Sequence, residues 1–327
     1  MAPGSFRPFR FSVQAFEATS AKEWIETARR AEDLGYATLF TTDHYFGPGS
    51  IAQESGHRPV DLAPVAACMA AAAATTTLRV GCRVFCVDYH HPVVLAKELA
   101  TLDLLSEGRL EVGLGAGWIA AEYAGLGMRM DRPGVRIERL GQVARLLRDH
   151  WRGEPLDVND TYVHASGFAG RPIPVQHPHP PLLIGGGGPV VLRTAGSLAD
   201  IVSLNFNNAA GKLGADSVAS SGLRATEQKI GWVREGAGSR FGDIELEIGA
   251  YFIAVGANHD AAAQAIASRF GVSPQAILDH PHALMGSPEA VCEQLHQLRE
   301  RLGISYVSVA QRHVDEFAPI VARLAGT

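Results

Sequence analysis

The sequence predicts a single (β/α)8 barrel of the TIM type that spans residues 1–327. Eight short apolar runs alternate with segments of helical character, and this alternation continues with little interruption along the chain. The runs are apolar on both sides, as parallel strands covered by helices must be. A doubly wound parallel sheet is the alternative, and no linker rich in Pro, Gly or Ser divides the chain into two domains.

The first half of the chain contains four predicted strand and helix pairs. The strands are Arg10–Ala15, Thr38–Thr42, Arg79–Val87 and Arg109–Gly115, and the helices run from Ser20 to Gly35, Asp61 to Ala74, Pro92 to Leu105 and Arg136 to Trp151. Ser20 followed by Glu23 has the spacing of a capping box, and Gly35 is typical of a helix end. Pro92 suits the first turn of its helix, where a proline costs no hydrogen bond.

The second half repeats this order. Its predicted strands are Pro181–Ile184, Asp200–Leu204, Glu245–Val255 and Tyr306–Ala310, and its helices are Pro189–Gly196, Arg224–Glu235, Asp260–Phe270, Pro288–Leu302 and Glu316–Ala325. Ser287 is placed to cap the helix that begins at Pro288.

Two segments interrupt the repeat as loop insertions. The first, Gly153–Pro180, follows the fourth predicted helix, is rich in Pro and His, and is expected to form hairpins or loops. The second, Asn205–Gly222, follows the sixth predicted strand and is polar and rich in Gly. Its position over the carboxyl ends of the strands makes it a candidate lid, and a passive surface insertion is the alternative.

Composition excludes several classes of function. A net charge of −5 leaves no basic surface for nucleic acid, and no apolar run reaches the roughly 20 residues needed to span a bilayer. The start of the chain has no apolar segment of the signal-peptide kind. The four cysteines have no spacing of a zinc site, and the thirteen histidines are scattered, so we expect reduced thiols, a cytoplasmic protein and no metal site.

Asp43 and His44 are the first candidate site residues, because they follow directly on the strand Thr38–Thr42. Active sites of parallel barrels lie at the carboxyl ends of the strands. A neutral imidazole near physiological pH is suited to a cofactor contact or to proton transfer. The alternative for this pair is a capping or packing role.

Two glycine-rich turns follow predicted strands. Gly113 to Trp118 includes Gly115 and Gly117, which would let the backbone approach a ligand closely or would only form a tight turn. Gly185–Gly188 joins a strand to a helix that begins at Pro189, a geometry whose exposed N–H groups bind phosphate, and a turn without a ligand is the alternative.

Arg83 lies within the third predicted strand between apolar neighbours. Inside a barrel, its guanidinium would need an acidic or phosphate partner. His90 and His91 follow the same strand on the predicted catalytic face, and the small-residue stretch Ala66–Ala74 would suit a dimer face or close packing on its own barrel.

Four segments in order resemble the bacterial luciferase-like monooxygenase family, in its branch that uses the deazaflavin coenzyme F420. They are Ala28–His44 with FTTDH, Leu78–Trp118 with GLGAGW, His179–Val202 with LIGGGGP, and Leu284–Leu295 with LMGSPEAV.

The resemblance implies a (β/α)8 barrel, commonly dimeric through the helices after the second and third strands, that binds the flavin-like ring in its mouth. It implies that His44 contacts the cofactor or acts in proton transfer, with Asp43 before it. It also implies a non-proline cis peptide at or beside Arg83–Val84 behind the ring, and a phosphate site at Gly186, Gly187 and Gly188.

One position departs from the sugar-phosphate dehydrogenases of this family, which have a glutamate after the glycines of the fourth strand. Here Trp118 occupies that place and offers an apolar wall to a ring or a substrate. Sugar-phosphate oxidation is therefore not assigned.

The resulting hypothesis is a coenzyme F420-dependent oxidoreductase that transfers hydride to or from a small organic substrate, with His44 assisting proton transfer. The first alternative is a two-component monooxygenase that takes reduced FMN from a separate reductase. The second is a flavin-binding barrel without catalysis.

Overall fold

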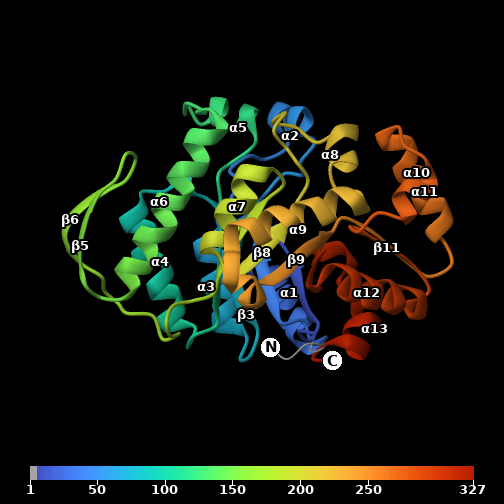
Figure 1. Cartoon of the computed structure of the whole chain (residues 1–327). Helices are drawn as coiled ribbons and strands as arrows, with labels where there is room; N and C mark the ends of the chain where they lie inside the picture. The colour runs from blue at the N-terminus through green and yellow to red at the C-terminus, as the bar shows by residue number, and fades with distance from the viewer. Residues whose placement is uncertain (1–5) are drawn as a thin grey trace.

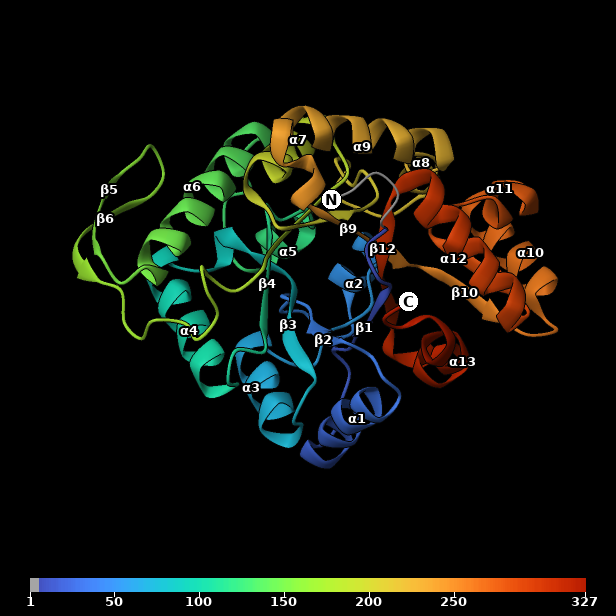
Figure 2. The same ribbon diagram turned by 60° about the horizontal axis from the view of Figure 1, so that its bottom comes forward.

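Eight parallel strands close into a barrel within residues 6–327, the part of the chain that the computed structural model describes. The strand order around the barrel is β1-β12-β9-β8-β7-β4-β3-β2, and the helices form an outer ring (Figures 1 and 2). The predicted (β/α)8 fold is confirmed, although residues 1–5 of the predicted domain lie outside the described part. No helix in residues 6–327 is long and apolar enough to cross a membrane.

The barrel strands are β1 (Arg10–Gln14), β2 (Thr38–Thr41), β3 (Arg79–Cys86), β4 (Leu110–Gly115), β7 (Leu182–Gly186), β8 (Ile201–Leu204), β9 (Glu245–Ala250) and β12 (Ile304–Ala310). The longer helices are α1 (Ala21–Asp33), α3 (Pro64–Ala74), α4 (Pro92–Leu105), α6 (Pro133–Trp151), α7 (Pro189–Leu198), α9 (Leu223–Ala237), α10 (His259–Phe270), α12 (Pro288–Leu302) and α13 (Val314–Leu324). Three 3₁₀ turns, η1 (Val87–Tyr89), η2 (Gly238–Asp243) and η3 (Gln311–His313), complete the connections within the described residues.

Local sequence signals account for where the helices begin. The Ser20 and Ser287 side chains accept hydrogen bonds from the backbone N–H groups of Glu23 and Ala290, each at 3.2 Å, so both predicted caps are confirmed. The Glu23 carboxylate accepts from the Thr19 N–H at 2.8 Å, one residue before the cap, and not from the cap itself. It therefore satisfies a neighbouring donor instead of closing a capping box.

The predicted strand Glu245–Val255 is wrong, because the structure divides it in two. β9 ends at Ala250, and β10 (Phe252–Val255) leaves the barrel to pair in parallel with β11 (Ala283–Gly286) in a separate sheet. Between them, the Tyr251 ring stacks on His282 with 5.1 Å between ring centres. β11 was not predicted, since four apolar residues give too short a pattern to distinguish a strand from a loop.

The first insertion contains an antiparallel hairpin, β5 (Pro155–Asn159) and β6 (His164–Ala169), as predicted for residues 153–180. It extends beyond the helices at the left of Figure 1.

The second insertion crosses the carboxyl end of the barrel and contains the short helix α8 (Ala215–Ala219). Its Leu213 N–H donates to the carbonyl of Ser55 at 3.0 Å, at the end of α2 (Ser50–Ser55). Helices α2, α5 (Ala120–Gly125) and α8 gather at this end in Figure 1. All three are too short for a period to show in the sequence. The position fits a lid, and that role stays a prediction.

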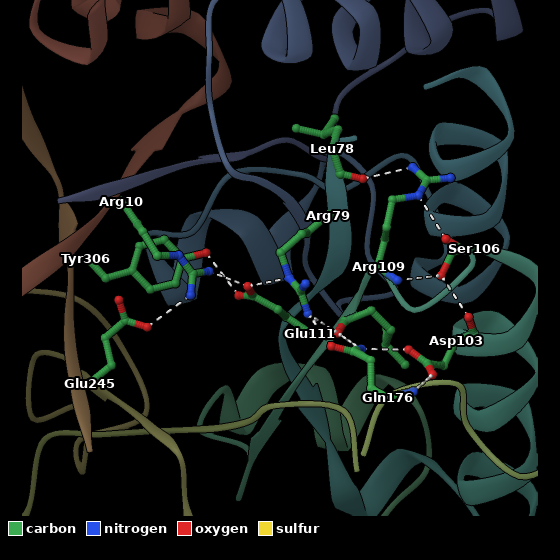
Figure 3. Close-up of polar contacts among 11 residues, drawn as sticks. Arg10, Leu78, Arg79, Asp103, Ser106, Arg109, Glu111, Gln176, Glu245 and Tyr306 are labelled. Carbon is green, nitrogen blue, oxygen red and sulfur yellow. Dashed lines mark hydrogen bonds and ion pairs between the residues drawn. The ribbon is translucent and has the colours of Figure 1, made fainter. Parts of the chain in front are cut away.

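A buried polar layer closes the opposite, amino end of the barrel (Figure 3). Glu111 of β4 is fully buried, and its carboxylate pairs with Arg10 of β1 and, at 2.8 Å, with Arg79 of β3. It also accepts the Tyr306 hydroxyl of β12 at 3.0 Å. Arg10 in addition pairs with Glu245 of β9 at 3.0 Å. One carboxylate thus joins four strands, so the amino end is filled by paired charges.

We expect Glu111→Ala to lower the free energy of unfolding by about 3–5 kcal/mol, because it leaves two guanidinium groups without their buried partner. Urea unfolding followed by circular dichroism measures this loss. Glu227→Ala is the control, since Glu227 forms an exposed pair with Arg301 and should cost less than about 1 kcal/mol. Equal losses in the two variants would show that the Glu111 layer does not stabilise the barrel.

Candidate functional site

His44 lies just beyond the carboxyl end of β2 and is held there by a glutamate that the sequence did not single out. Its Nδ1 is 2.7 Å from Oε2 of Glu122 in α5, and Oε1 of Glu122 accepts the Tyr45 N–H at 2.7 Å. Glu122 is buried, whereas His44 keeps 15% of its side-chain surface exposed. With the carboxylate as acceptor, the proton lies on Nδ1 and the lone pair on Nε2.

Aromatic rings surround His44. The ring centre of His57 lies 4.6 Å away, Phe46 5.6 Å and Trp118 6.2 Å. Burial, together with the neighbouring His44, lowers the pKa of His57 to about 3. His57 is therefore neutral near pH 7 and adds no charge to the site. Trp118 lies beside the predicted catalytic histidine, where it can form the apolar wall that the sequence suggested.

Asp43 joins the ends of β2 and β3. Its Oδ2 accepts the Cys86 N–H at 2.8 Å and lies 2.8 Å from Nε2 of His90. Its Oδ1 is buried and has no hydrogen-bond partner within residues 6–327. A buried acceptor without a donor is unusual in a folded protein.

The Arg83–Val84 peptide bond is cis, as the resemblance implied. The Val84 side chain occupies space that glycines leave free. A Cβ atom at Gly115 would lie 2.4 Å from Val84 Cγ2, and one at Gly113 would lie 3.2 Å from Cγ1. Residue 115 must therefore be glycine, because any side chain there would collide with Val84. Its absence lets the Val84 side chain project into the barrel.

Gly117 serves a turn. Its φ of +72° lies in the left-handed region, and a Cβ there would meet the Tyr123 hydroxyl at 2.1 Å. The structure therefore gives both Gly115 and Gly117 a local packing reason, and direct ligand contact by either stays a prediction.

Arg83 has the acidic partner that the sequence required. Its Nε lies 3.0 Å from Glu247 of β9, and Nη2 donates to Ser203 and Asn205, each at 2.9 Å. The buried guanidinium therefore already has hydrogen-bond and ion-pair partners within the protein. Any contact of residue 83 with a ligand is therefore expected from its backbone.

Gly186, Gly187 and Gly188 connect β7 to α7, with Gly188 as the residue before the helix. Gly187 has to be glycine, since a Cβ would lie 2.2 Å from the Phe206 carbonyl oxygen. Gly188 has no atom within 4 Å of the corresponding position. The start of α7 is thus open toward this loop, as a phosphate site at a helix N-terminus requires.

The structure places His44, Asp43, Val84 and Trp118 at the ends of the adjacent strands β2, β3 and β4, and the glycine loop follows β7, which pairs with β4. Sequence reasoning missed Glu122 and His57. Glu122 lies in α5, a helix too short to show a period in the sequence. No pattern in the sequence indicates His57.

Comparisons with known proteins agree with this fold. Residues 1–275 match the family described as luciferase-like monooxygenase. F420-dependent glucose-6-phosphate dehydrogenase of Gordonia bronchialis is 31% identical over 195 residues, which are 59% of this chain and 54% of that protein. The enzyme of the same name from Kribbella flavida is 29% identical over 237 residues, 70% of this chain and 64% of that one. The chain therefore spans about half the length of several curated relatives that it matches.

Solved structures show the same fold over almost the whole chain. The coenzyme F420-dependent tetrahydromethanopterin reductase of Methanopyrus kandleri has a TM-score of 0.75 at 17% identity, covering 97% of this chain and 99% of its own. The monooxygenase RslO1 of Streptomyces bottropensis has a TM-score of 0.71 at 24% identity, covering 96% and 97%. At these identities, the likeness establishes the fold alone.

We expect the low pKa of His57 to make stability depend on pH. Its pKa is 6.5 in the unfolded chain and about 3 in the folded one, so the unfolded state binds more protons between these values. The free energy of unfolding therefore falls as the pH drops below 6.5. Between pH 7 and pH 5, the free energy of unfolding of His57→Gln should fall by about 2 kcal/mol less than that of the wild type.

Urea unfolding at the two pH values measures this difference. His164→Gln, which replaces an exposed histidine in β6, is the control and should keep the wild-type loss. The same loss in all three proteins would mean that His57 titrates normally in the fold.

Proposed function

The chain belongs to the luciferase-like monooxygenase family, and on that premise we propose that it is a coenzyme F420-dependent oxidoreductase. It would transfer hydride to or from a small organic substrate in the barrel mouth. The observation that carries the proposal is His44, held at the carboxyl end of β2 by Glu122 at 2.7 Å. The names of the F420-dependent dehydrogenases among the relatives support the choice of cofactor.

Three features of the barrel mouth are compatible with binding of such a cofactor. Asp43 Oδ1 is a buried acceptor that lacks a donor within residues 6–327. Val84 presents an apolar surface at the cis peptide, where a flat ring could rest. The open start of α7 at Gly188 suits a phosphate.

When bound, the deazaflavin supplies or accepts the hydride, which is a pair of electrons with its proton. The side chains of this protein would bind, orient and move protons. The His44 Nε2 lone pair can take a proton from a substrate hydroxyl, and in the reverse direction the protonated ring can return it. Glu122 keeps the ring in one orientation and one tautomer, while Trp118 and Phe46 exclude water from it.

An FMN-dependent two-component monooxygenase is the second candidate, favoured by the likeness to RslO1 over 96% of the chain. It would need a separate reductase to supply reduced FMN. A barrel that binds a flavin without catalysis is the third, and the buried carboxylate that holds His44 at the barrel mouth argues against it.

We also propose a homodimer through α3 and α4, the helices after β2 and β3. Ala66, Ala70 and Ala73 are exposed at helical spacing on α3, and Val94 and Leu105 of α4 are 54% and 60% exposed. Small and apolar side chains on adjacent helices form a surface that a second copy could cover.

Titration with F420 and with FMN tests the choice of cofactor. We expect F420 to bind at micromolar concentration or tighter and to quench tryptophan fluorescence, because Trp118 lies beside His44. FMN should bind at least about tenfold more weakly, a difference of about 1.4 kcal/mol. Tight binding of FMN with no binding of F420 would overturn the first choice, and binding of neither by a folded protein would favour the non-catalytic barrel.

Substitution of His44 and Glu122 tests the catalytic assignment. His44→Ala should retain F420 binding within a few-fold but lose turnover by about 10²–10⁴-fold, the usual contribution of a general acid or base. Glu122→Gln should lose less, because the amide still reaches Nδ1 but no longer selects the tautomer. Unchanged turnover of His44→Ala, measured as the absorbance change of F420, would contradict the role of His44.

A further inference from the structure

A small cavity at the carboxyl end of the barrel is lined by more positive than negative charge. Gln14, Phe16 and Glu17 line it from the end of β1, Ala310, Gln311 and Arg312 from the end of β12, and Arg58 from the loop after α2. Its volume is about 130 Å³. We refer to it as the arginine cavity.

The arginine cavity lies beside the proposed reaction site. The Phe16 ring is 5.9 Å from the His57 ring, which is 4.6 Å from His44. The Gln14 amide donates to the carbonyl of Arg83 at 3.0 Å, next to the cis peptide. The rings of Phe16 and His57 therefore lie between the cavity and His44, and the Gln14 side chain links the cavity to the proposed wall of the cofactor.

The cavity is on the opposite side of the mouth from the glycine loop. In the closed strand order, β1 and β7 are separated by three strands in either direction. The loop at Gly186–Gly188 follows β7, whereas the arginine cavity follows β1 and β12. The two sites are thus too far apart around the barrel to hold the same phosphate group.

The charges in the cavity leave one guanidinium free. Glu17 is engaged by Arg58 at 2.9 Å. The nearby Glu316 accepts from Val255 N–H at 2.6 Å and lies 2.7 Å from His313 Nδ1. Within residues 6–327, neither carboxylate lies at ion-pair distance from Arg312.

Partial burial and the like charge of Arg58 lower the pKa of Arg312 from its ordinary value, while the more distant Glu17 and Glu316 raise it. The guanidinium itself is exposed to solvent and is therefore open to a ligand. An oxyanion could pair with it through two parallel hydrogen bonds, the geometry for which arginine is suited.

We infer that the arginine cavity is the substrate subsite of the barrel mouth and binds the oxyanion, a carboxylate or a phosphate ester, of a small organic acid. A volume of about 130 Å³ holds such a group and is far too small for a deazaflavin. Phe16 and Ala310 give the carbon atoms next to the oxyanion an apolar contact. The catalytic part of this inference rests on the proposed function, but the binding of the anion does not.

Ligand-observed ¹⁹F NMR tests the inference with 4-fluorobenzoate, 4-fluorophenyl phosphate and the neutral 4-fluorobenzamide as probes. We expect at least one of the two anions to bind the wild type and to show broadened lines, and the amide not to bind. Arg312→Gln should weaken binding of that anion by at least about tenfold. The anion that binds more tightly identifies the substrate as a carboxylic acid or a phosphate ester.

Arg301→Gln is the matched control, because Arg301 lines a cavity of about 460 Å³ at the other end of the barrel. It should bind the probes as the wild type does. Equal binding by the wild type and Arg312→Gln, binding of the amide as tight as that of the anions, or loss of binding only in Arg301→Gln would overturn the assignment.

Addition of F420 separates this inference from the proposed function. Arg312→Gln should bind F420 as the wild type does, and F420 should not displace the anion. Displacement would show that the arginine cavity belongs to the cofactor. Anion binding that depends on Arg312 in a protein that does not bind F420 would leave the subsite in place and refute only the proposed cofactor.

Discussion

Closure of the barrel around Glu111 is the constraint on which the rest of the structure depends. A carboxylate with no exposed surface is stable in a protein interior only when cations and donors surround it. Arg10, Arg79 and the Tyr306 hydroxyl do so from three further strands. Since these groups fill the amino end, ligands have access to the barrel interior only from the carboxyl end, where His44, Asp43 and the glycine loop lie.

The carboxyl end carries three separate groups of residues around the ring of strands. The side of β2, β3 and β4 carries His44, the cis peptide and Trp118, and the side of β7 carries the open start of α7. The side of β1 and β12 carries the arginine cavity. This arrangement suits a cofactor with its phosphate on one side and an anionic substrate on the other, with the imidazole between them. The insertion with α8 crosses this end and contacts the end of α2 through Leu213.

The predictions that succeeded rest on signals that are local in the chain. Ser20 and Ser287 cap the helices that follow them, because the cap bonds a backbone N–H three residues away. The barrel strands are buried on both faces and are therefore apolar throughout. The predictions that failed concern pairing. β9 and β10 form one apolar run in the sequence, and only the partner strand β11, about thirty residues later, separates them.

The sequence by itself determined the order of the barrel strands and longer helices, the family to which the chain belongs, and the position of His44 at the end of a strand, because each is encoded by neighbouring residues. Only the tertiary structure decided what surrounds that histidine. Glu122 is 78 residues away from His44 in the chain, and Arg58 and Arg312 are brought to one cavity by closure of β1 against β12. Contacts between residues so far apart depend on barrel closure, and no pattern within one segment of the sequence can specify them.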